Sequence, residues 1–260
     1  MISNTQTTLI EADKHLPTNR PAAVLKESTM KPTASSLIRW AGLAAVGAGI
    51  IFAAIQPIHP ADVVASVTTP EWAIITSFKT VACLLFLLGI AGIYARQVKK
   101  TGWLGLAGFL LLSLSWSIQL AFVFTEAYIF PPLAAVAPKF VDSVLAVPSG
   151  RPVEMDLGAV PALYGILVGV AYMLGGLLFG LATFRARILP RLAGGLLAVA
   201  AALTPLAALF PHNIQRFAAV PVGLALAWLG YAIWSERRAR SWEVSDGGEV
   251  SPLLGQTPAE

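Results

Sequence analysis

Six apolar stretches, each about long enough to cross a lipid bilayer, determine what this chain can fold into. A hydrocarbon core of about 30 Å requires roughly 20 apolar residues in a helix. A helix also satisfies its own backbone hydrogen bonds within lipid. The sequence therefore predicts an all-α fold, a polytopic transmembrane bundle of six spanning helices. The expected spans are Leu37–Ile58, Trp72–Tyr94, Gly102–Tyr128, Ala159–Phe184, Leu192–Phe210 and Ile214–Trp234.

Lysine and arginine lie almost entirely on one side of these spans, as they do in cytoplasmic flanks. They cluster before the first span, after the second and fourth, and after the sixth: Lys14, Arg20, Lys26, Lys31, Arg39, Arg96, Lys99, Lys100, Arg185, Arg187, Arg191, Arg237, Arg238 and Arg240. The opposite side has only Lys139, Arg151 and Arg216, with five acids beside them. This pattern predicts a multi-pass membrane protein with both termini in the cytoplasm.

The net charge of +4 is therefore interpreted as a topology signal. No repeated basic and aromatic cluster indicates a nucleic-acid partner. The expected partner is the lipid bilayer, together with a small ligand or another membrane protein.

The domain organisation follows from the spans. A polar tail with no apolar run predicts a disordered cytoplasmic segment without a cleavable signal peptide. The transmembrane domain has one long outer connection, where apolar residues recur at helical spacing and predict a short surface helix over Lys139–Val147. The expected boundaries are residues 1–35 for the tail, 36–236 for the six-helix domain, 129–158 for the outer connection and 237–260 for the C-terminal tail.

Three spans end alike, with a glycine followed seven residues later by an arginine: Gly89 and Arg96, Gly180 and Arg187, Gly230 and Arg237. The hairpins of spans two–three and four–five could be parallel repeats. Convergence is the alternative, because small residues suit helix packing and arginine suits an inner flank. Small residues at four-residue spacing further predict that spans four, five and six pack tightly against one another.

Three polar residues lie within the outer part of spans two and three, where ionisable groups are costly. Lys79 and Glu126 fall at similar depths on adjacent antiparallel helices, and Gln119 lies two turns below Glu126 on the same face. They are the candidate ligand-binding residues. Either Lys79 snorkels to the headgroups while Glu126 reaches water, or the two form a buried pair at the floor of an outward-facing pocket. The sequence slightly favours snorkelling.

Other chemistry-bearing residues do not form a recognisable motif. His59 and His212 are both on the outer side, but no third ligand has metal-binding spacing, so neither a metal nor a haem site is favoured. Cys83 is the chain's one cysteine and is expected to be core filler. The sequence contains no phosphate-binding glycine loop and no HExxH helix. No cofactor and no catalytic residue are expected.

One segment carries a family resemblance. It is the run Trp72 … Leu88-Gly89 … Tyr94-Ala95-Arg96-Gln97 … Gly102-Trp103-Leu104-Gly105-Leu106-Ala107-Gly108-Phe109, followed by Glu126-Ala127 and Pro132 … Pro138. Over residues 70–138 it resembles uncharacterised bacterial six-helix integral membrane proteins. The resemblance implies a bacterial inner-membrane bundle and no particular activity.

The expected function is that of a ligand-binding, sensory or accessory membrane component with an outward-facing polar pocket. A small-molecule transporter is the alternative, although the inner halves of most spans are apolar. An intramembrane enzyme comes third, because no residue pattern argues for one.

Overall fold

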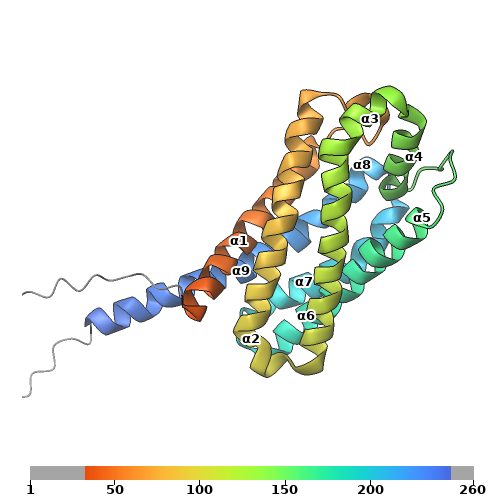
Figure 1. The fold of residues 1–260 in the computed structure, drawn as a ribbon. Helices are drawn as coiled ribbons and strands as arrows, with labels where there is room; N and C mark the ends of the chain where they lie inside the picture. The colour runs from red at the N-terminus through yellow and green to blue at the C-terminus, as the bar shows by residue number, and fades with distance from the viewer. Residues whose placement is uncertain (1–32, 247–260) are drawn as a thin grey trace, which may run out of the picture. The chain divides into compact units, whose positions relative to one another are not determined.

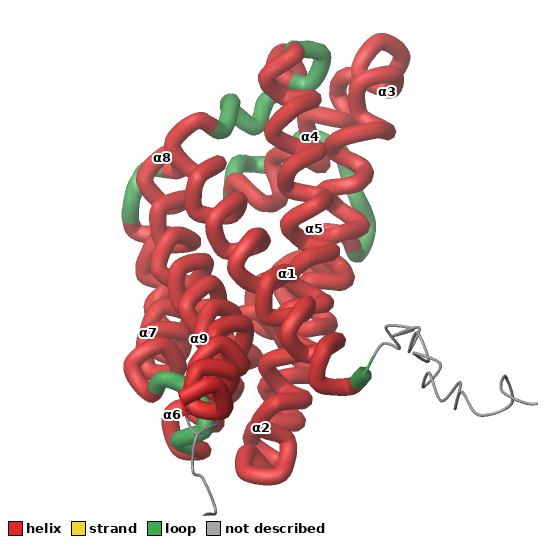
Figure 2. The backbone as a smooth tube through the Cα atoms, turned by 90° about the vertical axis from the view of Figure 1, so that its left-hand side faces the viewer, coloured by secondary structure: helices red, strands yellow, loops and turns green. Residues whose placement is uncertain are grey.

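The computed structural model describes the backbone of residues 33–246 and their side chains, except at 208, 212–213 and 237–246. Of the tails expected over residues 1–35 and 237–260, residues 1–32 and 247–260 lie outside what is described, as does the His212 side chain. Within the described range every regular element is a helix (Figures 1 and 2). The principal helices are α1 (Ala34–Ile55), α2 (Pro70–Phe124), α6 (Ala171–Ala186), α7 (Arg191–Leu203) and α9 (Ala219–Asp246).

The long helix α2 is a hairpin. Its backbone leaves the helical region at Gly102, where φ is 55° and ψ is −156°. Only glycine adopts a positive φ without steric cost, so this residue allows the chain to reverse. Two antiparallel arms result, residues 70–101 and 103–124, and they stand side by side in Figure 1. The expected second and third spans are these two arms.

Four helical segments are long and apolar enough to cross a membrane: Ala34–Ile58, Pro70–Val136, Val160–Ala186 and Arg216–Glu236. The second of them is the hairpin. The fifth expected span, Leu192–Phe210, is shorter than predicted, because its apolar helical segment covers only Arg191–Ala207. Its α-helix ends at Leu203 and continues as the 3₁₀ element η5 (Thr204–Leu209). Pro205 lies at this change, and proline removes a backbone hydrogen bond from a helix.

The sixth expected span, Ile214–Trp234, is assembled from short pieces at its outer end. The α8 turn (His212–Gln215) and the 3₁₀ element η6 (Arg216–Ala218) precede α9. Pro221 lies in the first turn of α9, where its missing N–H breaks no hydrogen bond within that helix. At the other end α9 continues beyond Trp234 to Asp246.

Close backbone contacts at small residues hold the helices of the bundle together. Side chains added at these glycines would collide with a neighbouring helix: Gly42 with Gly230, Gly49 with Gly223, Gly89 with Ala45, Gly108 with Phe179, Gly176 with Ala201, and Gly180 with Gly194 and Ala198. Among described residues, the apolar core beside them includes the fully buried side chains Phe86, Ile90, Ile93, Leu112, Phe179 and Leu197. The inner half is consequently a packed core.

Two details of the expected packing are wrong. The small face of the sixth span, at Gly223, meets Gly49 of the first span and not the fourth or fifth. On the fourth span, the four-residue spacing of Gly165 and Gly169 predicts a close contact with another helix. A Cβ at either position would, however, meet no atom within 4 Å. The fourth and fifth spans do pack closely through small residues, with Gly176 against Ala201 on α7.

The helical segment of the third expected span continues beyond Tyr128 and past Pro131. After α2 the chain widens into the π-helical η3 (Thr125–Ile129) and then continues as α3 (Phe130–Val136). Pro131 stands in the first turn of α3, where no helical N–H is needed. The helix expected over Lys139–Val147 is present as α4 (Pro138–Ser149), and a small second core lies beneath it: Val67, Trp72, Phe130, Val141, Val144 and Leu145.

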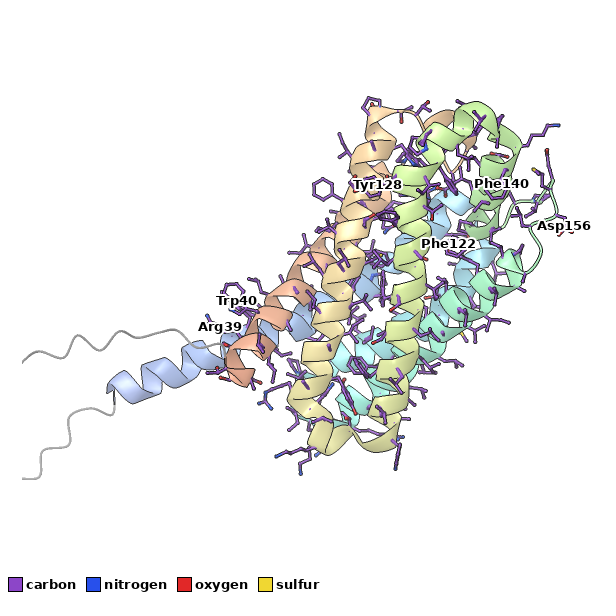
Figure 3. All side chains as sticks on the ribbon, in the orientation of Figure 1. Arg39, Trp40, Phe122, Tyr128, Phe140 and Asp156 are labelled. Carbon is purple, nitrogen blue, oxygen red and sulfur yellow. The ribbon has the colours of Figure 1, made fainter. Side chains whose placement is uncertain are left out.

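The two ends of the bundle differ in which segments meet there. Segments around His59, Asp142, Arg151 and Arg216 gather at one end. At the opposite end Arg96 pairs with Glu236 at 2.8 Å, and Arg39 stacks 5.8 Å from the Trp234 ring. Figure 3 labels Arg39 and Trp40 near one end of the bundle and Tyr128, Phe140 and Asp156 near the other. The connections that follow α1, the second arm of α2 and α7 therefore lie at the same end of the bundle.

Large apolar side chains cover the outside of the helices. On the first arm of α2, Ile74, Phe78, Val81, Leu84 and Leu88 are 46–59% exposed. In water such a surface would be unfavourable, whereas in lipid it is the expected solvent-facing surface. The Lys79 side chain, on the same arm, is 16% exposed, which means that its position on the helix faces the bundle.

Candidate functional site

Lys79 and Glu126 form a buried ion pair at the outer end of the hairpin. Nζ of Lys79 lies 2.5 Å from Oε2 of Glu126, and the two side chains are only 16% and 7% exposed. Lys79 precedes Gly102 by 23 residues and Glu126 follows it by 24. Each is about 35 Å from the turn at 1.5 Å per residue, so the hairpin brings them level. The snorkelling interpretation, which the sequence favoured, is wrong.

His59, in the connection between α1 and α2, forms a hydrogen bond with the lysine of this pair. Its Nε2 lies 3.2 Å from Nζ of Lys79, and its Nδ1 lies 2.7 Å from the carbonyl oxygen of Pro60. Because a carbonyl only accepts, Nδ1 carries the proton and Nε2 accepts from the lysine. Burial lowers the pKa of His59 from 6.5 to about 4, helped by the positive charges of Lys79 and Arg216 and partly opposed by Asp62. The imidazole is therefore neutral near pH 7.

A second ion pair stands beside the first. Nη2 of Arg216 lies 2.6 Å from Oδ2 of Asp62, and both side chains are nearly buried. Nη1 of Arg216 also donates to the carbonyl oxygens of His59 and Pro60, at 3.3 and 3.2 Å. Arg216 thereby fixes the segment that presents His59 to Lys79. The sequence alone indicates only that Asp62 and Arg216 are charges on the outer side, because 154 residues separate them and no local pattern links them.

Arg151 fastens the outer connection to the same cluster. Its Nη2 donates to the Asp62 carbonyl oxygen at 2.7 Å, while its guanidinium contacts both carboxylate oxygens of Asp142 at 3.2–3.3 Å. Asp142 lies on α4. The long outer connection is thus tied to the segment between α1 and α2 by one arginine.

Gln119 lies one layer deeper, as its spacing from Glu126 predicts. Its Oε1 accepts a hydrogen bond from the Tyr164 hydroxyl at 3.3 Å. Tyr164 begins the π-helical η4 (Tyr164–Val170), which follows the short α5 (Val160–Leu163). The tyrosine was not among the expected site residues, since nothing in the sequence distinguishes it from other tyrosines near span ends.

Lys79, Gln119 and Glu126 all line one cavity of about 350 Å³. Its outer wall is polar and includes Gln56, His59, Asp62, Gln215 and Arg216. Its deeper wall is aromatic and apolar and includes Phe52, Cys83, Trp116 and Tyr172. Trp116 meets Phe52 and Tyr172 edge-on, with ring centroids 5.2 and 6.1 Å apart. The cavity therefore has a charged, hydrogen-bonding end and an aromatic end.

Both π-helical segments border this cavity. A π turn leaves a carbonyl without its usual helical partner, and such turns are frequent at functional sites. In η3 the carbonyl of Glu126 accepts from the Trp72 indole at 2.9 Å, and in η4 that of Val168 accepts from the Ser115 hydroxyl at 3.0 Å. Each irregular turn thus receives a hydrogen bond from a side chain on a facing part of α2, and the Val168 carbonyl also accepts from the N–H of Ala171. The widened turns therefore persist without unpaired carbonyls at these two positions.

A second hollow, of about 520 Å³, lies beyond the polar wall. The two spaces share the residues Gln56, His59, Asp62 and Arg216, and the outer one also touches Ser149 and Arg151. The Arg216–Asp62 pair and the His59 ring therefore form a partition between the outer hollow and the cavity.

A metal role for the histidines gains no support from the geometry. Nε2 of His59 already accepts from Lys79, and the His212 side chain is outside what the structure describes. Within the described part of the chain no group of three or more His, Cys, Asp or Glu side chains is placed to hold an ion. The site offers paired charges, amides and aromatic rings, which are groups that bind a small molecule.

Comparison with known proteins adds no further constraint on the site. No protein-family model, no curated protein and no solved structure matches this chain.

We predict that the Lys79–Glu126 pair is coupled in stability. Lys79→Met and Glu126→Gln should each lower the free energy of unfolding by about 3–5 kcal/mol, because each leaves a buried charge without its partner. The double variant should recover much of that loss. Unfolding of the purified protein in detergent, followed by tryptophan fluorescence, measures all three.

A matched control exists at the other end of the bundle, where Arg96 and Glu236 pair with 30% and 33% of their side chains exposed. Arg96→Met and Glu236→Gln should cost only about 0–1 kcal/mol each. If the losses at Lys79 and Glu126 simply add, the two side chains are not coupled.

We predict that His59 makes stability depend on pH below neutrality. Because its pKa is lowered from 6.5 to about 4, the unfolded chain takes up a proton first. Stability should therefore be full above pH 6.5 and should fall by up to roughly 3 kcal/mol between pH 6.5 and 4. His59→Gln, which keeps an acceptor for Lys79, should remove this component from the thermal midpoint measured against pH. Asp62 and Glu126 remain in both proteins, so the difference between the two curves isolates His59. Parallel curves would contradict the prediction.

Proposed function

We propose that this chain is a six-span protein of a bacterial inner membrane that binds a small molecule in an outward-facing cavity, acting as a ligand-binding, sensory or accessory component. The observation that carries the proposal is the buried Lys79–Glu126 pair in the wall of a 350 Å³ cavity. Ionisable groups at membrane depth are costly and tend to mark functional sites. Pockets of this size, apolar with a few convergent polar groups, are typical of small-ligand sites.

The combination of polar and aromatic walls also supports binding. Lys79 and Gln119 offer donors at one end, while Phe52, Trp116 and Tyr172 offer ring surfaces at the other. A purely structural ion pair would need no cavity beside it. The charge pair is expensive to bury, and a packed apolar replacement would be at least as stable.

A transporter is less well supported by the packing. Alternating access would need a polar route from the cavity to the inner end. Among the described residues that separate the two ends, Phe86, Ile90 and Phe179 are fully buried in one apolar cluster. As for an enzyme, the hydroxyl of Ser115, which lines the cavity, already donates to the Val168 carbonyl.

The proposed orientation places the Arg96 end of the bundle in the cytoplasm and the His59 end outside. Lysine and arginine crowd the first of these ends. The hairpin at Gly102 and the shared end for the connections around His59, Arg151 and Arg216 support six crossings, with α7 and η5 together forming a short fifth crossing.

We predict that disrupting the Lys79–Glu126 pair removes a bound small molecule from the purified protein. Organic extracts of wild-type protein purified in detergent should contain a molecule, detected by mass spectrometry, that extracts of the Lys79→Met/Glu126→Gln double variant lack. The Arg96→Met/Glu236→Gln double variant should retain it, because that ion pair is remote from the cavity. Equal extracts from all three proteins would contradict ligand binding at this site.

We predict the orientation from accessible positions. In a Cys83→Ala chain, cysteines at the exposed residues Thr68 and Glu154 should react with a membrane-impermeant thiol reagent in intact cells. A cysteine at the exposed residue Lys100 should react only after the membrane is permeabilised. Labelling of Lys100→Cys alone in intact cells would reverse the orientation.

A further inference from the structure

One side of the cavity is open in the outer half of the bundle. Gly169 of η4 lines the cavity and is exposed, and a methyl group placed there would meet no atom within 4 Å. Thr204, at the start of η5, lines the cavity as well. The η4 and η5 segments therefore both border the cavity, and its wall is open at Gly169.

The rim of this opening is apolar. On η4 the side chains of Ile166 and Val170 are 58% and 44% exposed, and on the other side Leu203 and Leu206 are 52% and 53% exposed. All four belong to apolar helical segments, Val160–Ala186 and Arg191–Ala207. An opening flanked by such side chains, within spans of this kind, faces hydrocarbon and not water.

The opening has a local cause. The α7 helix ends at Leu203, and the narrower 3₁₀ turn with Pro205 follows. The α6 and α7 helices touch through Gly176, Gly180 and Ala201. Beyond these contacts η4 has bare glycines facing open space, so the two segments separate where the cavity begins.

Among the residues whose side chains the structure describes, the charges that line the cavity occur in opposite pairs. Lys79 is paired with Glu126 and Arg216 with Asp62, while His59 is neutral near pH 7. A charged ligand would leave one buried charge uncompensated, which is strongly unfavourable. Hydrogen-bonding capacity nevertheless remains at the cavity: among described residues Oε1 of Glu126 and Nε2 of Gln119 have no hydrogen-bond partner, although both side chains line it.

We propose that the cavity takes an uncharged, ring-bearing amphipathic molecule directly from the lipid, through the opening between η4 and η5. The hydroxyl or carbonyl group of this molecule forms a hydrogen bond with Lys79, Glu126 or Gln119 at the polar end of the cavity. Its ring lies against Phe52, Trp116 and Tyr172. This inference rests on the proposed ligand-binding function and adds the class of ligand and its route.

Cys83 provides a native reporter for the test, because it is the chain's one cysteine and lines the cavity. The protein, reconstituted in phosphatidylcholine vesicles, is treated with three methanethiosulfonates that differ in charge: benzyl (uncharged), sulfonatoethyl (anionic) and trimethylammonioethyl (cationic). Intact-protein mass spectrometry follows the modification of Cys83. Each reagent's intrinsic reactivity is taken from the unfolded protein, where Cys83 is fully accessible.

The corrected rate of the benzyl reagent should exceed those of the two charged reagents at least about tenfold, because charge is excluded from membrane depth. Gly169→Leu should slow the benzyl reagent by a similar factor. Gly165→Leu should not, since this position also faces open space but is not among the described residues that line the cavity. A Thr204→Cys/Cys83→Ala chain should show the same order of reagents at the rim.

Faster labelling by a charged reagent would overturn the lipid route in favour of access from water. An unchanged benzyl rate in Gly169→Leu, or no benzyl labelling of the folded protein, would also overturn it. These outcomes are separable from failure of ligand binding itself. If the wild-type extract contains a molecule but a charged reagent labels Cys83 faster, only the route from the lipid is refuted. If the benzyl reagent labels Cys83 fast but no molecule is extracted, the proposed ligand-binding function is refuted.

Discussion

The buried contact between Lys79 and Glu126 is the interaction around which the outer half of this protein is organised. It exists because α2 reverses at Gly102, a residue whose positive φ other amino acids rarely adopt, nearly midway between the two charges. Once the pair is buried, each remaining polar atom around it needs a partner. His59 accepts from the lysine, and Trp72 donates to the Glu126 carbonyl in the widened turn. The Arg216–Asp62 pair then holds the segment that carries His59.

The inner half of the bundle contributes mainly to stability, and the outer half contains the candidate binding site. In the inner half, glycine and alanine contacts bring helix backbones together, and large side chains fill the core. In the outer half, two π turns, a shortened α7 and the bare surface of Gly169 leave a space that side chains do not fill. A cavity next to four paired charges costs stability, which is consistent with a site kept for binding. The well-packed half supplies the rigidity that such a site needs.

The predicted sites differ in how much of their geometry is local. Lys79, Gln119 and Glu126 were found from the sequence because helical spacing and depth counting apply to two adjacent antiparallel spans. Asp62, Arg216 and Tyr164 were not identified as site residues. They come from separate connections and from another span, and their meeting depends on how the helices are arranged around each other. The same holds for the contact of Gly223 with Gly49, which replaced the expected contact with spans four and five.

The sequence by itself determined that the chain is all-helical within the described range, where its apolar segments lie, and which three polar residues share the outer part of the hairpin. These properties follow from hydropathy and helical periodicity, which are local. Only the tertiary structure decided that Lys79 is paired and does not snorkel, that His59 and Arg216 join it, and that a cavity opens beside Gly169. The physical reason is that pairing a buried charge and leaving a space unfilled both depend on groups supplied by distant segments. Their positions are set by helix packing and not by the spacing along any one helix.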